Sequence, residues 1–500
     1  MNTKVALVAA GLVAFSGFSL QGAGAWTQFR GPAGAGLAEG AKPPVAFGAQ
    51  SNVLWKVPVS KGLSSPVVNE KSIFLTGHEG NRLETLCLDR KTGEVRWRQA
   101  VQAATLEKVH GANSVATPTP VCDHERVYSY FGSVGLIAYD LEGHEVWKQS
   151  LPMPKTFMNQ GTATSPILVG DFVLLFEQDG DESALIAFRA ADGKEAWRAK
   201  CPVYNNTWST PMSWKEPGGQ RVGLACAGRF SAFDAGTGKL VWWSDGLSRM
   251  ACAVPLCVED TLYISSAAVQ GERSNMKVPP EFEEFVKQYD KDGDGKIAAT
   301  EIPSDYLFTD RQASGGAGNM NLRQAMRFFA GVDTSKPLDK EAWNQMRAGL
   351  KEFINSEWNN SNLMAVRTGG KGDVSKSNRI WQESRGVPEM ASAIIYGSHI
   401  YQVRSGGLVL CRDLATGKQV YEERLSAHGG YFASPVAADG RIYAASDQGV
   451  VTVIGTGDRF AELAHNDLGE PIKATPAIVD DTVFVRSEKH LWAFNERAGK

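Results

Sequence analysis

The sequence predicts an all-β fold, an eight-bladed β-propeller of four-stranded blades, with a small α-helical insertion in blade five. Three observations support this prediction. A repeat of about 40 residues recurs along most of the chain. The repeats hold short apolar runs separated by turns, and one interval between copies is long enough for a repeat plus an inserted segment. The 52 Gly and 13 Trp residues also agree with turn-rich β structure.

The overall composition describes a folded protein without a broad basic surface. Of the 500 residues, 52 are Lys or Arg and 55 are Asp or Glu, which gives a net charge of −3. A nucleic-acid-binding surface requires clustered basic residues, so we expect no nucleic acid among the partners. Hydrophobic residues make up 43% of the chain, which is enough for a large core and excludes a disordered chain.

The first 25 residues have the features of a cleavable secretory signal peptide. Lys4 precedes an apolar stretch from Val5 to Leu20, and Ala23-Gly24-Ala25 provides small residues for cleavage. No later segment is long and apolar enough to span a membrane, and no Cys lies near the cleavage point to accept a lipid. We therefore expect an exported protein, periplasmic or extracellular, with no transmembrane segment after cleavage.

The seven cysteines are an odd number, which leaves at least one thiol unpaired unless a partner chain supplies another. Most of them lie in apolar, strand-like runs, so we expect them to behave as small buried hydrophobic residues. A disulfide involving Cys252 or Cys257 stays open as an alternative in an oxidising compartment.

The repeat is marked by a small residue followed by proline at the start of an apolar run. Successive copies are 54, 46, 45, 44, 138, 42 and 41 residues apart, with Ser392-Ala393 taking one position without the proline. Proline is tolerated at the first residue of a strand, and a small Ser or Thr suits inner strands that converge on an axis. The other copies begin at Ser65-Pro66, Thr119-Pro120, Ser165-Pro166, Thr210-Pro211, Val254-Pro255, Ser434-Pro435 and Thr475-Pro476.

A second motif inside the repeats is a turn containing Gly, followed a few residues later by an aromatic residue. Asp and Thr side chains bond the local backbone in such turns, and Gly accepts a positive φ. We expect the aromatic residue to start the last strand of its blade and to pack against the neighbouring blade. The examples are Gly93 with Trp97, Gly143 with Trp147, Gly193 with Trp197, Gly238 with Trp242, and Gly417 with Tyr421.

The final repeat, which starts at Thr475-Pro476, contains three apolar runs and no fourth. A lone strand-like segment from Leu54 to Val59 precedes the first repeat and carries an aromatic residue at the expected place. We predict that this segment completes the last blade, because ring closure removes an exposed sheet edge.

The chain therefore divides into four segments. The insertion is placed by the strand-like runs from Thr261 to Ile264 and from Leu363 to Val366, which we assign as the second and third strands of blade five. The expected segments are a signal peptide (1–25), the closing strand with blades one to the first half of five (26–270), the insertion (271–362), and the second half of blade five with blades six to eight (363–500).

Residues 290–301 in the insertion match a calcium-binding EF-hand loop at its defining positions. Such loops hold Ca²⁺ through oxygen ligands, and Gly295 permits the sharp turn that they need. A solvated acidic turn is the alternative, but agreement over the whole loop and the helical spacing of residues 282–289 favour Ca²⁺ as the cofactor. The expected ligands are the carboxylates of Asp290, Asp292, Asp294 and Glu301 and the backbone carbonyl of Lys296.

A second loop downstream, from Val332 to Trp343, resembles a degraded partner of this EF-hand. It lacks the central Gly and keeps too few carboxylates in register, so we predict that it binds no metal. We expect Ile297 of the first loop to pair with it. Pro303 closely follows Glu301 and should shorten or displace the exit helix.

The insertion joins the second and third strands of its blade. Because strands alternate in direction, it should leave the ring on the face that also carries the blade-to-blade connections, the longest of which contains residues 110–113. We hypothesise that this face, insertion included, is an interaction surface. A solvated linker is the alternative for the long connection.

The Ser/Thr-Pro and Thr-Gly-x-x-x-Trp motifs, together with the opening Trp26-Thr27-Gln28-Phe29-Arg30-Gly31-Pro32, resemble those of the pyrroloquinoline-quinone-like (PQQ-like) β-propeller repeat proteins. Exported members of that group are often described as similar to the outer-membrane assembly lipoprotein of the barrel-assembly machinery. The resemblance implies a role in envelope biogenesis. This chain departs from that lipoprotein in lacking a lipid-acceptor Cys and in carrying the calcium loop.

We therefore expect an exported, non-catalytic scaffold or binding protein with one bound Ca²⁺, whose partner is a protein or polysaccharide of the cell envelope. The alternative is a quinone-dependent dehydrogenase with PQQ in the propeller. The resemblance implies that such enzymes stack the quinone on a vicinal disulfide and hold calcium inside the propeller. This chain has no Cys-Cys pair, and its calcium motif lies in the insertion. No G-x-S-x-G or H-E-x-x-H motif suggests a hydrolase.

Overall fold

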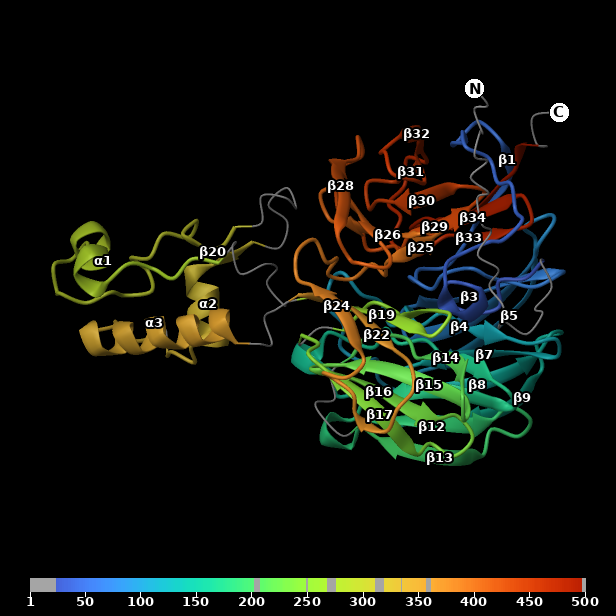
Figure 1. The fold of residues 1–500 in the computed structure, drawn as a ribbon, viewed down its shortest axis with the longest axis horizontal. Helices are drawn as coiled ribbons and strands as arrows, with labels where there is room; N and C mark the ends of the chain where they lie inside the picture. The colour runs from blue at the N-terminus through green and yellow to red at the C-terminus, as the bar shows by residue number, and fades with distance from the viewer. Residues whose placement is uncertain are drawn as a thin grey trace, which may run out of the picture.

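The strands of the protein form eight blades around a ring, which confirms the predicted eight-bladed β-propeller (Figure 1). The structure is a computed structural model, and it describes residues 24–201, 207–248, 251–267, 276–310, 319–333, 335–356 and 361–496. The predicted signal peptide lies almost wholly outside these residues. None of the described helices is long and apolar enough to cross a membrane.

Within each blade the strands are antiparallel and, along most of the chain, follow one another in sequence order. The first strands of several neighbouring blades contact one another, so they form the inner wall of the ring. The first four blades contain β2 (Val67–Val68), β3 (Ser72–Glu79), β4 (Arg82–Asp89) and β5 (Val95–Gln102); β6 (Val121–Cys122), β7 (Arg126–Phe131), β8 (Gly135–Asp140) and β9 (Glu145–Gln149); β10 (Ile167–Val169), β11 (Phe172–Glu177), β12 (Ala184–Arg189) and β13 (Glu195–Lys200); and β14 (Met212–Glu216), β15 (Gly219–Cys226), β16 (Arg229–Asp234) and β17 (Leu240–Asp245).

The second half of the ring repeats this arrangement. A short strand, β23 (Gly372–Asp373), adds to the outer edge of blade four by pairing in parallel with β17. Blades five to eight contain β18 (Leu256–Val258), β19 (Thr261–Ser266), β22 (Asn362–Arg367) and β24 (Arg379–Glu383); β25 (Ile394–Tyr396), β26 (His399–Arg404), β27 (Leu408–Asp413) and β28 (Gln419–Arg424); β29 (Val436–Ala438), β30 (Arg441–Ala445), β31 (Val450–Gly455) and β32 (Glu462–Asp467); and β33 (Ala477–Val479), β34 (Thr482–Arg486), β35 (His490–Phe494) and β1 (Val53–Pro58).

The N-terminal strand β1 closes the ring, as predicted, by pairing antiparallel with β35 as the fourth strand of blade eight. An ionic contact supports this closure, because Glu470 lies 3.0 Å from Lys56 Nζ on β1 and 2.7 Å from His490 Nδ1 on β35. Burial alone would raise the pKa of Glu470, but hydrogen bonds from His490, Ser487 and Lys56 hold that pKa at about 2.

The Gly-aromatic motif joins neighbouring blades, as the sequence predicts. The indole of one blade lies over the glycine turn of the next, where φ is positive and a Cβ atom would come within 2.4–2.8 Å of the ring. Only glycine satisfies both conditions. The glycine partners of Trp55, Trp97, Trp147, Trp197 and Trp381 are Gly93, Gly143, Gly193, Gly238 and Gly417. The same indoles donate to the carbonyls of Arg90, Leu141, Ala190, Ala235 and Leu414.

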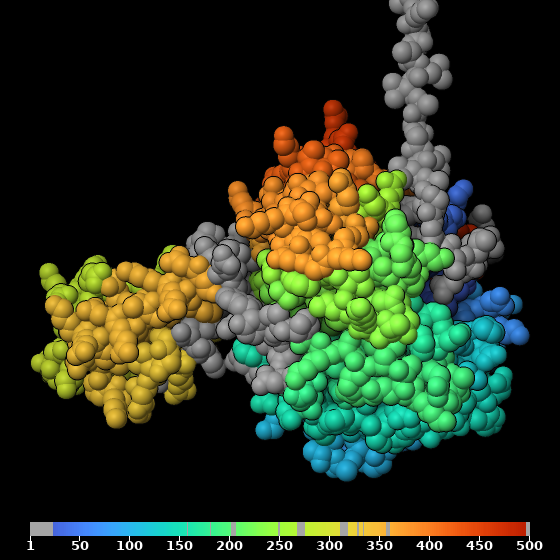
Figure 2. All heavy atoms as spheres, turned by 60° about the horizontal axis from the view of Figure 1, so that its bottom comes forward, coloured from blue at the N-terminus to red at the C-terminus, as the bar shows by residue number. Residues whose placement is uncertain are grey.

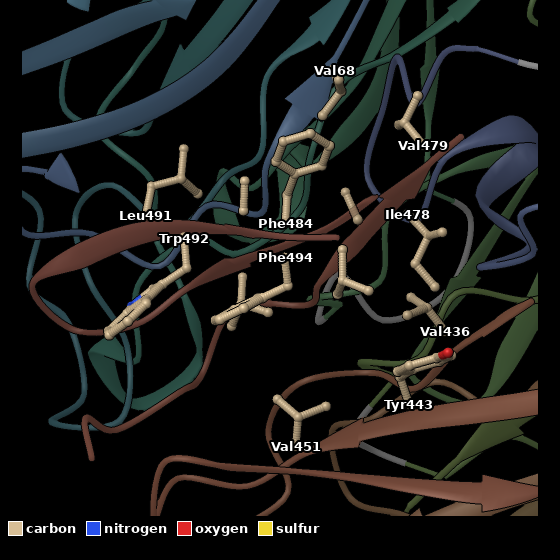
Figure 3. Packing of buried hydrophobic residues seen from close by; sticks show 14 of the residues in the cluster. Val68, Val436, Tyr443, Val451, Ile478, Val479, Phe484, Leu491, Trp492 and Phe494 are labelled. Carbon is tan, nitrogen blue, oxygen red and sulfur yellow. The ribbon is translucent and has the colours of Figure 1, made fainter. Parts of the chain in front are cut away.

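The hydrophobic core lies between the blades, since the two faces of each sheet pack on its two neighbours. Figure 3 shows one such region, where Phe484 and Phe494 of blade eight lie near Tyr443 of blade seven and Val68 of blade one. These four side chains are at most 1% exposed. Burial of this kind, repeated around the ring, is the main stabilising contribution.

Two fully buried arginines add polar links within the ring. Arg486, at the end of β34, donates to backbone carbonyls of Ser64 and Thr76 in blade one. Arg30, in the segment before β1, donates to the carbonyl of Ala393 at the start of blade six. Burial lowers the pKa of both guanidinium groups to about 9, and carbonyl acceptors take the place of carboxylates.

None of the seven cysteines, all of which lie among the described residues, forms a disulfide in the structure, so Cys252 and Cys257 are not disulfide-bonded. One pair is nevertheless close. Cys201 follows β13 and Cys226 ends β15, and their Sγ atoms lie 3.1 Å apart between blades three and four.

The insertion is a separate helical unit that stands to one side of the blades (Figures 1 and 2). It has its own hydrophobic core, in which Phe285, Ile297, Trp343 and Leu350 are fully buried. No helix directly follows Pro303, in agreement with the prediction. The elements are α1 (Phe282–Tyr289), β20 (Leu307–Thr309), β21 (Met320–Asn321), α2 (Leu322–Phe329) and α3 (Lys340–Asn355).

The root of the insertion lies beside a blade-to-blade connection. Ser266, the last residue of β19, is paired with Asn362, the first residue of β22, so the two ends of the insertion are neighbours. The Asn362 side chain donates to the carbonyl of Gly246, and Ser248 N donates to Ser266 Oγ. The insertion and the connection from blade four to blade five therefore leave the ring on one face.

Candidate functional site

Two places in the molecule gather chemically useful groups, and the first is the loop of residues 290–301, here called the acidic loop. It connects α1 to the rest of the insertion. Carboxylate oxygens of Asp290, Asp292 and Asp294 lie within 4.8 Å of one another. Among the residues that the structure describes, this is the one cluster of three or more such side chains with the spacing of a metal site.

Backbone N–H groups hold these carboxylates in place. Asp290 accepts hydrogen bonds from Gly293 N and Gly295 N, and both glycines have positive φ values, of 74° and 72°. Asp292 accepts from Asp294 N, and Asp294 accepts from the N–H of Lys296. The chain is therefore wrapped around the carboxylates in a geometry that suits a small cation.

The structure does not place the remaining predicted carboxylate in the same cluster. Glu301 accepts from Lys291 N through Oε1 and from Ala298 N through Oε2, which anchors it across the base of the loop. These hydrogen bonds, with that from Ala298 first, lower the pKa of Glu301. Glu301 is 6% exposed, and its lowered pKa keeps the carboxylate ionised. It can therefore supply a ligand oxygen in addition to those of the three Asp residues.

The second loop pairs with the first, and its Asp carboxylates accept hydrogen bonds within the loop and at the start of α3. Ile297 and Leu338 exchange two backbone hydrogen bonds, of 2.9 and 2.8 Å, as expected for Ile297. Asp339 caps α3 by accepting from Ala342 N, and Asp333 accepts from Ser335. The carboxylate of Asp339 is thus used as a helix cap, and that the second loop binds no metal stays a prediction.

The second place is a cavity of about 170 Å³ in the channel of the ring, here called the channel cavity. Its wall is formed by the residues that begin the inner strands, and its rim includes the blade-to-blade connections. The described lining residues are Phe29, Leu63, Ser65, His110, Ala112, Asn113, Thr117, Thr119, Gln160, Ala163, Ser165, Trp208, Cys252, Met390, Ser392, Phe432, Ser434, Lys473 and Thr475.

The small residues before the repeated prolines link successive blades by hydrogen bonds. In each link, the backbone N–H at this position in one blade donates to the hydroxyl oxygen at the same position in the next. This explains the recurring Ser or Thr better than small size alone. The links run from Ser65 to Thr119, Thr119 to Ser165, Ser165 to Thr210, Val254 to Ser392, Ser392 to Ser434, and Ser434 to Thr475, at 2.9–3.1 Å.

The segment before β1 fills the far end of the channel. Trp26 forms a backbone bridge with Val68, the last residue of β2, and Cys122, the last residue of β6, donates its N–H to the Thr27 carbonyl. Phe29 reaches the channel cavity and forms part of its lining. The residues of this segment resemble those of a family, but their place in the channel was not predicted from the sequence.

The chemistry of the channel cavity does not fit a metal-bound quinone. Among its described lining residues there is no carboxylate, and carboxylates would be needed to hold a divalent or trivalent cation. Burial raises the pKa of the Cys252 thiol to about 12, so it is not available as a thiolate ligand or nucleophile. Lys473 and His110 are the lining residues with basic side chains.

The comparisons with known proteins agree with this fold. The sequence model of the family described as outer membrane protein assembly factor BamB matches residues 45–209 and 362–500, leaving out blade four, the start of blade five and the insertion. No curated protein matches the chain significantly.

Among solved structures, BamB from Moraxella catarrhalis superposes with a TM-score of 0.50 at 11% identity, covering 88% of this chain and 98% of that one. A europium-containing methanol dehydrogenase gives 0.51 at 12% identity, covering 95% and 98%. The computationally designed Ika8 protein gives 0.51 at 9% identity, covering 89% and 100%. Similarity at these identities concerns the fold alone.

Proposed function

Because the chain belongs to the family described as outer membrane protein assembly factor BamB, we propose that it is an exported, non-catalytic scaffold that binds proteins of the cell envelope during outer-membrane assembly. The observation that carries the proposal is the family match across both parts of the propeller. The chemistry of the channel cavity is consistent with it, because the described lining residues include no carboxylate to hold the cation of metal-quinone chemistry.

The interaction surface in this proposal is the face from which the insertion leaves the ring. The insertion replaces a turn between paired residues, Ser266 and Asn362, so it adds surface without changing the blade. It lies to one side of the propeller in Figure 2 and is a compact unit with its own hydrophobic core. A unit that is already folded adds binding surface without the entropic cost of ordering a chain on binding.

Calcium in the acidic loop is the second part of the proposal. The three clustered Asp carboxylates would bind the ion, with Glu301 and the Lys296 carbonyl completing the oxygen set. The ion would offset the electrostatic repulsion among the carboxylates. It would also restrict the motion of α1 relative to the second loop. For a protein outside the cytoplasm, a dissociation constant of about 10⁻⁴–10⁻³ M would suffice.

The calcium proposal can be tested by terbium luminescence, because Tyr289 directly precedes Asp290 and can sensitise a lanthanide in the loop. We expect Tb³⁺ emission that Ca²⁺ displaces, and loss of both in Asp292→Ala. Asp333→Ala is the matched control, since it removes an acid from the second loop only. Equal binding by the wild type and Asp292→Ala would contradict the proposal.

The scaffold proposal can be tested by replacing residues 268–360 with a short Gly-Asn-Gly turn. The pairing of β19 with β22 should allow the propeller to fold, which circular dichroism would verify. We expect full-length protein to capture envelope proteins of the assembly pathway from detergent extracts, and the shortened variant to lose them. Capture of the same proteins by both forms would show that the insertion is not the interaction surface.

The quinone-dependent dehydrogenase remains a distinct function to test. It predicts a quinone absorbance band in purified protein and dye reduction with an alcohol after reconstitution. We expect neither result, because the channel cavity offers no carboxylate among its described lining residues to hold the cation beside the quinone.

A further inference from the structure

We propose that the channel cavity is a binding site for a small organic monocarboxylate with an apolar body. This inference is independent of the scaffold function, because it concerns the interior of the ring and not the insertion. It rests on the hydroxyls, the lysine side chain and the apolar walls of the cavity.

The Ser and Thr hydroxyl groups of the inner wall can act as hydrogen-bond donors toward the cavity. Five lining residues accept a backbone N–H from the preceding blade, each is at most 3% exposed, and none donates to a protein acceptor among the described residues. Each hydroxyl lines the cavity and keeps a proton to donate, so it can donate to a ligand or to water inside the cavity. The five residues are Thr119, Ser165, Ser392, Ser434 and Thr475.

A single cation sets the charge that the site prefers. Lys473 lines the cavity two residues before Thr475, and its Nζ lies 5.5 Å from the centre of the Phe432 ring. No carboxylate in the part of the chain that the structure describes forms an ion pair with Lys473. An ammonium group that lines the same cavity as several hydroxyl donors, with no carboxylate among the described lining residues, favours an anion over a neutral ligand.

The rest of the wall is apolar. Phe29 comes from the segment that fills the far end of the channel, and Leu63, Trp208, Met390 and Phe432 complete the apolar lining. The indole N–H of Trp208 already donates to the Gly161 carbonyl, so its ring offers a face and no free donor. A ligand with one acidic group and a compact apolar body therefore matches both parts of the site.

The volume limits the ligand to a small molecule. A cavity of about 170 Å³ accepts a body of the size of a single aromatic ring rather than a polymer. One ammonium group matches one carboxylate, whereas a tricarboxylate would leave charges without partners in a mostly apolar site. Benzoate is therefore a suitable probe, and benzamide is its neutral isostere.

The test measures binding of benzoate and benzamide to the full-length protein by titration calorimetry. We expect benzoate to bind and benzamide to bind at least about tenfold more weakly, because a charge-assisted hydrogen bond to Lys473 is lost. Lys473→Met should lower benzoate affinity by a similar factor, and Lys473→Arg should restore most of it. Lys489→Met, at an exposed site on the same blade, should bind benzoate as the wild type does.

The hydroxyls are tested separately with Thr475→Val, which keeps the shape of the side chain and should weaken benzoate binding in folded protein. The proposal is overturned if benzoate does not bind, if benzamide binds equally well, or if Lys473→Met leaves the affinity unchanged. Binding of PQQ without binding of benzoate would also overturn it, in favour of a quinone site. Each of these results is independent of envelope-protein capture, so it leaves the scaffold proposal to its own test.

Discussion

Replacement of Gly193 by Ala should destabilise the propeller through a contact between blades, and the structure allows the size of the effect to be worked out. The glycine has φ of 70°, and an added Cβ would lie 2.6 Å from the indole of Trp147 in the preceding blade. Left-handed backbone costs alanine about 1 kcal/mol, and forcing an extra methyl into a packed contact costs about 1–3 kcal/mol. We expect a total loss of about 2–4 kcal/mol.

Gly170 in the same blade provides a matched control. Its φ is 57°, and a Cβ at that position would meet no atom within 4 Å. Gly170→Ala should therefore show only the backbone cost of about 1 kcal/mol. The difference between the two variants isolates the contact with Trp147.

The assay is urea denaturation followed by tryptophan fluorescence, with circular dichroism to confirm a common folded state. A double mutant adds a second criterion, because in Trp147→Ala the added methyl of Gly193→Ala has space. The two changes together should then cost less than the sum of their separate effects. Equal losses for Gly193→Ala and Gly170→Ala, or strict additivity with Trp147→Ala, would refute the interlocking of indole and turn.

Three further predictions concern ring closure and the thiols. Because the folded-state pKa of Glu470 is about 2, its stabilising effect should be complete above pH 4.5 and decrease as the pH falls from 4.5 towards 2. Glu470→Gln should thus be less stable than the wild type at pH 6 and nearly equal to it at pH 2, as measured by thermal unfolding; a constant difference would contradict this. Arg486→Met should cost about 1–3 kcal/mol in urea denaturation by leaving buried carbonyls without donors, whereas no loss would mean that water replaces the guanidinium. Under a disulfide oxidant, Cys201 and Cys226 should form a disulfide, detected as loss of two alkylatable thiols by mass spectrometry, and Cys226→Ser should prevent it.

The ring could be predicted from the sequence because the contacts between neighbouring blades require particular residue types at fixed positions of the repeat. A Gly at positive φ under an indole recurs in five of the eight blades, and a Ser or Thr before the inner strand recurs in all but blade five, so both recur at a measurable spacing. Ring closure by residues 53–58 could also be predicted, because a missing fourth strand at one end and a spare strand at the other can be counted.

The acidic loop could be found for a similar reason, since its candidate ligands lie within twelve consecutive residues and the spacing itself carries the information. The placement of Glu301 could not be predicted, because its hydrogen bonds to Lys291 and Ala298 depend on the folded loop. The channel cavity is the opposite case. Its lining comes from many blades and from the segment before β1, and such a set has no local pattern in the sequence.

The direction of the channel places the approach to the cavity and the insertion on one face of the ring. The segment that begins at Trp26 pairs with the last residues of β2 and β6, so it occupies the end of the channel away from the Ser and Thr residues that begin the inner strands. The cavity must then be approached from the end where those residues and the blade-to-blade connections lie. The insertion leaves from this same face, because Ser266 and Asn362 bond to the connection at residues 246–248. A partner bound by the insertion and a ligand entering the channel would therefore meet on one side of the ring, and the closed end would be left to hold the ring together.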